Sequence, residues 1–245
     1  MLISRITLFI STLTILLILW KGLNLSYLVS ALITLAIIMI GYIIIGLRRS
    51  NKRINLLDKD LDPEAFIEAI EKQRKITGKN RRINTYLDYD LVAGLISMGR
   101  YEEAKDIIDN MNIKYIPKWN GALLGYYNNK MILLYNLGKK DEADEIFEKY
   151  VKTFPLKTPT LKYFMKIILA VKNFEEGNFE ECKELCNEYL SINKNKRIEL
   201  ELLYMLAEID EEQGDIESAR EKYNKIAKEG NKLYTAFKAR EKISE

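Results

Sequence analysis

The stretch Leu137-Gly138-Lys139-Lys140-Asp141-Glu142-Ala143 recurs in altered form at three other places in the chain: Met98–Ala104 (MGRYEEA), Glu176–Cys182 (EGNFEEC) and Gln213–Ala219 (QGDIESA). The glycines of the four copies, Gly99, Gly138, Gly177 and Gly214, are 37 to 39 residues apart. A constant period of this size indicates stacked supersecondary units in place of a single globular core. The chain is therefore predicted to contain an array of four repeats.

Each copy has a small residue five positions after its glycine, namely Ala104, Ala143, Cys182 or Ala219. Four residues later stands a larger apolar or sulfur-containing side chain, Ile108, Phe147, Cys186 or Tyr223. On a helix this spacing places both side chains on one face. From Leu61 onward the pattern is one amphipathic helix after another, and no useful length alternates with a period of two. We therefore predict an all-α fold without strands.

Taken together, these units resemble the tetratricopeptide repeat (TPR), in which a glycine turn joins two antiparallel helices. Over about Tyr86–Glu229 the resemblance implies a TPR-like, right-handed α-solenoid of about four helix pairs with capping helices, which would follow the two N-terminal transmembrane helices predicted below from the apolar runs. The repeats are divergent: the tryptophan of the family's first helix is absent, and only the second unit ends on its proline, Pro155. Leu61–Thr77 is expected to cap the start, beginning at the N-cap signal Asp62-Pro63-Glu64. Asn231–Ser244 is expected to cap the end, with Leu233, Phe237 and Ile243 facing inward.

In this family the first helix of each pair lines a concave groove that binds a protein or peptide partner. The candidates implied here are Tyr86, Tyr89, Asn128, Tyr135, Asn136, Phe164, Glu201 and Glu208, together with Ile132, Ile167 and Val171. The glutamates predict a preference for basic segments at the C-terminal end of the groove. Ordinary packing between helices is the alternative interpretation for each of these residues. Only an asparagine of the family's clamp for a C-terminal carboxylate is retained, as Asn129, so that ligand is not expected.

Two apolar runs precede the repeats, Leu2–Trp20 and Tyr27–Leu47. A helix needs about 20 such residues to cross the hydrocarbon of a bilayer. We therefore expect a transmembrane hairpin, with Trp20 and Tyr27 on either side of its turn at one interface. The alternative interpretation of the first run is a cleaved signal peptide, but no small-residue cleavage site follows it.

The first 53 residues contain six Lys or Arg and no Asp or Glu, whereas the rest of the chain carries a net charge of about −3. Arg48, Arg49, Lys52 and Arg53 follow the second run, against Lys21 alone in the turn. By the positive-inside tendency this bias places the repeats in the cytoplasm of a plasma (inner) membrane protein. The expected domains are residues 1–53, the hairpin with its basic flank, and residues 54–245, the repeats.

Signals for catalysis are missing. The chain has no histidine, the commonest general base and a frequent metal ligand. Gly78-Lys79 and Gly138-Lys139 lack the remainder of a phosphate-binding loop. Cys182 and Cys186 lie four residues apart, which suits core packing better than half of a zinc site. We predict that the protein is not an enzyme and has no cofactor, no metal, no nucleic-acid partner and no small-molecule substrate.

Two functions remain open. The first is a membrane-anchored TPR-like scaffold or adaptor that binds a protein or peptide at the cytoplasmic membrane face. The second is an accessory or assembly subunit of a membrane enzyme or transporter complex, bound mainly through its hairpin, in which Ser30, Ala31, Thr34 and Gly41 permit close helix approach.

Overall fold

A computed structural model describes residues 5–192 and 195–244 of the chain; Leu2 and the Arg5 side chain, which belong to the first predicted run, lie outside the described residues. Within this range the secondary structure is helical and contains no strand, so the all-α prediction is confirmed. The chain divides into two compact units, Met1–Lys52 and Arg53–Glu245.

The first unit holds α1 (Arg5–Leu17), a π-helical turn (Ile18–Gly22) and α2 (Tyr27–Asp58) up to the unit's end. The rings of Trp20 and Tyr27 meet edge to face across the turn, with centroids 5.8 Å apart. On α2, Ser30 and Thr34 are buried while most of the large apolar side chains are exposed. By length and composition α2 alone among the described helices could cross a membrane, with a mean hydropathy of 2.7 over its most apolar window. The first predicted span forms a shorter apolar helix, Thr7–Gly22.

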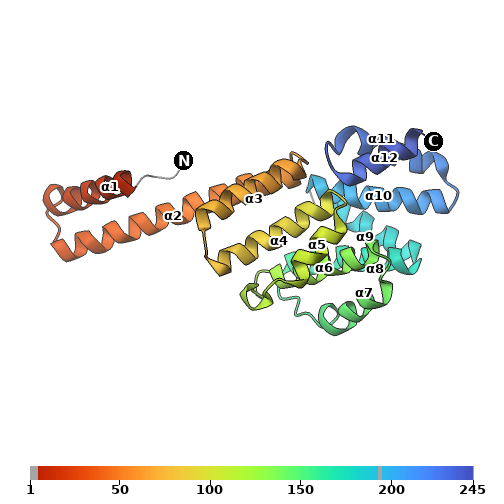
Figure 1. The fold of residues 1–245 in the computed structure, drawn as a ribbon, viewed down its shortest axis with the longest axis horizontal. Coiled ribbons are helices and arrows are strands. Elements are labelled where there is room, and N and C mark those ends of the chain that lie inside the picture. Colours follow the sequence, from red (N-terminus) through yellow and green to blue (C-terminus); the bar gives the residue numbers. More distant parts are fainter. Residues whose placement is uncertain (1–4, 193–194, 245) are drawn as a thin grey trace. The chain divides into compact units, whose positions relative to one another are not determined.

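The second unit contains the four predicted helix pairs, preceded by α3 (Pro63–Thr77) and followed by α12 (Tyr234–Ser244) (Figure 1). The pairs are α4 (Arg81–Ser97) with α5 (Tyr101–Asp109), α6 (Ala122–Asn136) with α7 (Lys140–Ile146), α8 (Pro159–Glu176) with α9 (Phe179–Ile192), and α10 (Lys196–Glu212) with α11 (Ile216–Glu229). A 3₁₀ turn (Ile113–Tyr115) precedes α6, and a π-helical turn (Phe147–Val151) extends α7.

Short-range chemistry accounts for the helix boundaries. The Asp62 carboxylate accepts a hydrogen bond from the Ala65 N–H at 3.0 Å and caps α3, as predicted. The glycines of the four turns all have positive φ, between 70° and 83°, a region that L side chains rarely adopt. The small residues that follow them are buried: Ala104, Ala143 and Cys182 are fully covered and Ala219 is 2% exposed. Each pair therefore packs its second helix closely on its neighbours.

The two ends of the array contact one another, an arrangement that the sequence did not predict. Leu61, 3% exposed, packs in the same apolar cluster as Leu233, Tyr223 and Ala236 from the last helices. The Lys232 Nζ lies 2.9 Å from carboxylate oxygens of both Asp62 and Glu64. The backbone N–H of Lys232 also donates to the Leu61 carbonyl at 3.2 Å. The second unit is therefore a closed ring of helices in which each end covers the other.

A second set of closing contacts joins α12 to the first repeat. The Tyr234 ring meets the Tyr101 ring edge to face, with centroids 6.1 Å apart. It also lies over Gly99, where a Cβ atom would come within 2.7 Å of the ring. The expected inward face of the last helix is wrong at one position, because Phe237 is 53% exposed. Leu233 is buried, and Ile243 packs partly buried on the same cluster.

Candidate functional site

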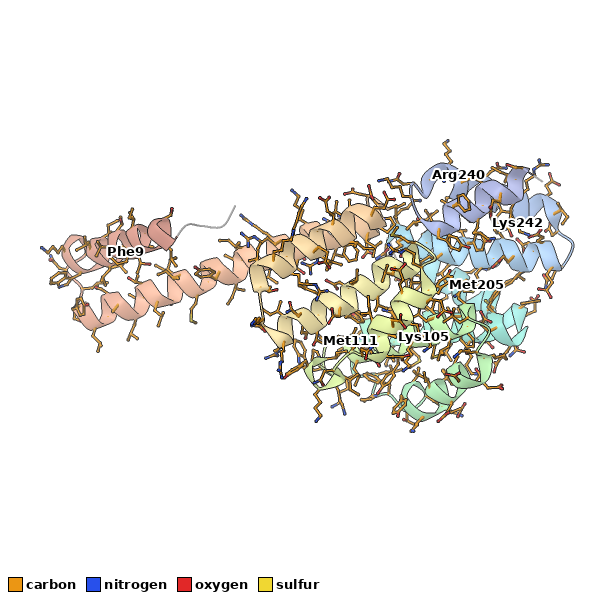
Figure 2. The ribbon with its side chains drawn as sticks, viewed as in Figure 1. Phe9, Lys105, Met111, Met205, Arg240 and Lys242 are labelled. Atoms are coloured by element: carbon orange, nitrogen blue, oxygen red, sulfur yellow. The ribbon has the colours of Figure 1, made fainter. Side chains whose placement is uncertain are left out.

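The ring of helices in the second unit surrounds a cavity of about 520 Å³. Its wall combines first helices of all four pairs with Tyr101 of α5 and residues of α12. Met205, labelled in Figure 2, belongs to this wall on α10. Ring closure adds residues of α12 to the wall of the predicted concave groove. This space is the candidate site.

Most of the groove residues predicted from the sequence line this cavity: Tyr89, Asn128, Ile132, Tyr135, Asn136, Phe164, Ile167, Val171, Glu201 and Glu208. Tyr86 is not among the lining residues and lies half-buried elsewhere on α4. Asn129, the one residue retained from the family's carboxylate clamp, also lines the cavity.

Several lining residues were missed as groove candidates, notably Tyr101, Glu175, Arg197, Tyr204, Tyr234 and Lys238. The family pattern assigns the groove to first helices, which draws attention away from Tyr101 at the start of a second helix. Tyr234 and Lys238 belong to α12, and only ring closure brings that helix to the cavity. Glu175 and Tyr204 lie on first helices and were within reach of the pattern.

Amide side chains line the wall contributed by α6. Asn128 is only 7% exposed, and no hydrogen bond joins its side chain to any residue in the described part of the chain. Asn129 beside it is half-buried and likewise has no hydrogen bond there. The Asn136 side chain donates to the Ile132 carbonyl at 2.9 Å. The Asn128 amide is not among the fully buried unpartnered atoms and lines the cavity, so its donors and acceptors are available to a ligand there.

The Tyr89 side chain depends on a glycine for its position. A Cβ atom added to Gly125 would collide with the Tyr89 hydroxyl oxygen. Burial, with the nearby Asp90 carboxylate as a second cause, raises the pKa of Tyr89 to about 12. This hydroxyl therefore stays protonated at neutral pH, and Tyr89 contributes no charge to the cavity wall.

The basic group Arg197 is neutralised within the wall. Its Nε lies 2.9 Å from an Asp58 oxygen and its Nη1 lies 3.0 Å from a Glu201 oxygen. Burial opposes the charged form, but Glu201 and Asp58 outweigh it and raise the pKa of the guanidinium. Because Asp58 ends α2, just before α3, and Arg197 lies in the first turn of α10, this ion pair also contributes to ring closure.

Two carboxylates of the wall lack such a partner. Burial, the largest effect, raises the pKa of Glu208 to about 7; Lys242 and the Tyr204 hydroxyl oppose the rise, and Glu211 and Glu175 add to it. Burial also raises the pKa of Glu175, against the attraction of Lys140. Among the described residues neither Glu175 nor Glu208 forms an ion pair within 4.0 Å. The side of the cavity formed by α8 and α10 therefore carries two carboxyl groups that no cation neutralises.

The cysteines lie away from this cavity. Cys182 and Cys186 are fully buried, with their sulfur atoms 4.0 Å apart, in a core cluster of α8, α9 and α10. In the described part of the chain, no group of three or more His, Cys, Asp or Glu residues has a metal-binding arrangement.

A closed array of helix pairs with glycine turns and a ligand-sized interior defines a helical-repeat binding protein. Residues 70–229 match the family model described as the SusR N-terminal TPR domain, and the chain belongs to this tetratricopeptide-repeat family. No curated protein matches the chain. No solved structure matches it either. TPR domains are interaction scaffolds, so this class of function holds for the chain.

Proposed function

We propose that this protein is a membrane-anchored scaffold that holds a protein partner at the cytoplasmic face of the plasma membrane by a short peptide segment of that partner. The observation that carries the proposal is Asn128, an amide buried in the cavity wall without a hydrogen-bond partner among the described residues. A peptide backbone supplies both the acceptor and the donor that such a side chain requires.

The rest of the wall supports the same ligand. Tyr89, Tyr135 and Phe164 provide aromatic surface, which contributes large contact areas at a low entropic cost. The volume of about 520 Å³ lies in the range of small-ligand pockets, roughly 300 to 1,000 Å³. It suits a few residues of an extended segment or a chain terminus and is too small for a folded domain.

The anchoring part of the proposal is supported by α2, which has the length and hydropathy of a membrane span. Arg48, Arg49 and Lys52 follow its apolar part, whereas Lys21 is the only basic residue in the turn before it. The positive-inside tendency favours a cytoplasmic second unit. Cysteine labelling of intact cells tests this orientation: a cysteine introduced at exposed Glu212 is expected to resist a membrane-impermeant maleimide until the cells are permeabilised. Labelling before permeabilisation would contradict it.

Photocrosslinking in cells tests partner binding at the cavity. Benzoylphenylalanine replaces Phe164, which lines the cavity, or Phe237, which is 53% exposed on the outer side of α12 and serves as a matched aromatic control. We expect one discrete protein adduct from position 164, with the crosslink mapping to a single short segment of the partner, and no such adduct from position 237. Adducts of equal yield at both positions, or none at 164, would refute the proposal.

The same experiment separates the alternative role as an assembly subunit. When an unrelated two-span hairpin replaces residues 1–52, the adduct at position 164 is expected to persist, because the cavity lies wholly within the second unit. Loss of the adduct with retained expression would favour recognition through the hairpin.

A further inference from the structure

The charges of the cavity wall do not balance. Five charged side chains line the cavity: Arg197, Lys238, Glu175, Glu201 and Glu208. Arg197 is paired with Glu201 in the wall and with Asp58 behind it. Lys238 lies 3.5 Å from Glu241. Glu175 and Glu208 have no ion pair within 4.0 Å among the described residues.

The basic groups nearest these two carboxylates are already engaged. The Lys242 Nζ, whose attraction Glu208 feels, lies 2.9 Å from Glu211 instead. The Lys140 Nζ donates to the backbone carbonyl of Glu175 at 2.9 Å and not to its carboxylate. Glu175 and Glu208 also repel each other. Both side chains are half-buried, and a carboxylate partly withdrawn from water without a cation is costly, so this pair favours an added positive charge.

Aromatic rings and amides of the same wall complete the surroundings of such a charge. Tyr204 and Phe174 line the cavity together with Glu208 and Glu175, and the Glu208 carboxylate is, after burial, one of the causes that raise the pKa of Tyr204. Ring faces attract cations, most strongly where water is excluded. Independently of the carboxylates, the buried and unpartnered Asn128 indicates that the cavity receives a polar ligand.

We propose that Glu175 and Glu208 form a subsite for one basic side chain of the bound peptide, an arginine or lysine whose cation lies between the two carboxylates and the ring of Tyr204. This inference rests on the proposed function and adds the chemistry by which the cavity selects its segment. Arginine suits the site best, because its planar guanidinium presents five donors and stacks on aromatic rings.

Titration calorimetry on the full chain in nanodiscs tests the subsite. The probes are the blocked tripeptides acetyl-Ala-Arg-Ala-amide and acetyl-Ala-citrulline-Ala-amide, which differ chiefly in the charge of one side-chain group. We expect the arginine peptide to bind at least about tenfold more tightly, as hydrogen bonds to charged groups and cation–π contacts imply. Glu208→Gln and Glu175→Gln are each expected to abolish most of that difference.

Glu212→Gln is the matched control. Glu212 is exposed, lies on α10 four residues after Glu208 and does not line the cavity, so its substitution changes the net charge equally. It is expected to leave the preference for arginine unchanged. Unfolding midpoints within error of wild type establish that the variants are folded. Equal affinity for the two peptides, or an equal loss in Glu212→Gln and Glu208→Gln, would overturn the proposal.

Methylguanidinium serves as a third probe and distinguishes a peptide side chain from a free small cation. Binding of methylguanidinium as tight as that of the arginine peptide would overturn the assignment to a peptide. A discrete crosslink at position 164 without any preference for arginine would refute this subsite alone. Failure of both experiments would refute the proposed function as well.

Discussion

Truncating Leu61 tests the closed ring most directly. Its side chain is 3% exposed and packs among residues of α10, α11 and α12, although it lies just before α3. Replacing a buried leucine with alanine costs about 2 to 5 kcal/mol, depending on how far the site collapses. Leu61→Ala is therefore expected to lower the free energy of unfolding by about 3 kcal/mol.

The backbone at Leu61 refines this estimate. Its φ is +53°, in the left-handed region, which costs an L residue roughly 1 to 2 kcal/mol. Glycine removes that strain but adds about 0.5 to 1 kcal/mol of backbone entropy in the unfolded chain. Leu61→Gly should therefore equal Leu61→Ala in stability or exceed it by up to about 1.5 kcal/mol. Urea unfolding of the full chain, followed by circular dichroism, measures both variants.

A double-mutant cycle supplies the decisive comparison. Leu61 and Leu233 share one cluster, so the combined alanine variant should depart from additivity by about 0.5 kcal/mol or more. Leu61→Ala with Ile168→Ala is the control, since Ile168 is fully buried in a separate cluster and the two effects should add. Additivity in the first pair would refute the closure of the ring, whereas a Leu61→Gly variant clearly less stable than Leu61→Ala would refute the left-handed backbone at Leu61.

Three further predictions concern the repeats and the cavity. Ala143→Asp places an unpaired charge at a fully buried position and should abolish cooperative unfolding of the second unit; an unchanged melting curve would contradict the packing of the second repeat. Gly99→Ala should destabilise the chain by about 1 to 3 kcal/mol more than Gly138→Ala does. Both glycines have positive φ, but only Gly99 lies under the ring of Tyr234. Equal losses of unfolding free energy in urea would argue against that contact. The pKa of Glu208 in the folded chain is about 7, above its ordinary value of 4.5. The folded chain therefore binds this proton more tightly than the unfolded chain, and the stability that Glu208 contributes falls as the pH rises from 4.5 through 7. Glu208→Gln should therefore stabilise the chain at pH 8 and have little effect at pH 4.5, with Glu212→Gln inert at both values.

The sequence was sufficient for those features that depend on neighbouring residues. The turn glycines require a positive φ, the small residues after them face a close helix contact, and Asp62 caps the helix that it precedes. The candidate groove followed from the resemblance to the TPR family and the helical period, and the cavity wall includes most of its residues. Each of these features depends on residues a few positions apart.

What the sequence did not reveal depends on residues far apart. The Asn231 side chain donates to the Asp60 carbonyl across 171 residues, and no local pattern indicates such a contact. The last helix was therefore treated as an independent cap with Phe237 facing inward, whereas Tyr234 and Leu233 make the contacts. For the same reason the sequence did not indicate that Tyr101 of α5 and Tyr234 of α12 line the cavity. The prediction that Tyr86 lines the groove was wrong for a simpler reason. The helical period indicates which face of α4 points inward but not which of its turns reach the cavity.

The meeting of the two ends also bears on how this protein can vary. An open solenoid tolerates insertion or loss of a repeat, because each unit touches only its immediate neighbours. Here the contacts of Asp58 with Arg197 and of Leu61 with Leu233 require a fixed total rotation around the circle. A copy gained or deleted would leave these termini out of register, so we expect the number of helix pairs to be fixed by closure while loops and inward side chains are free to change.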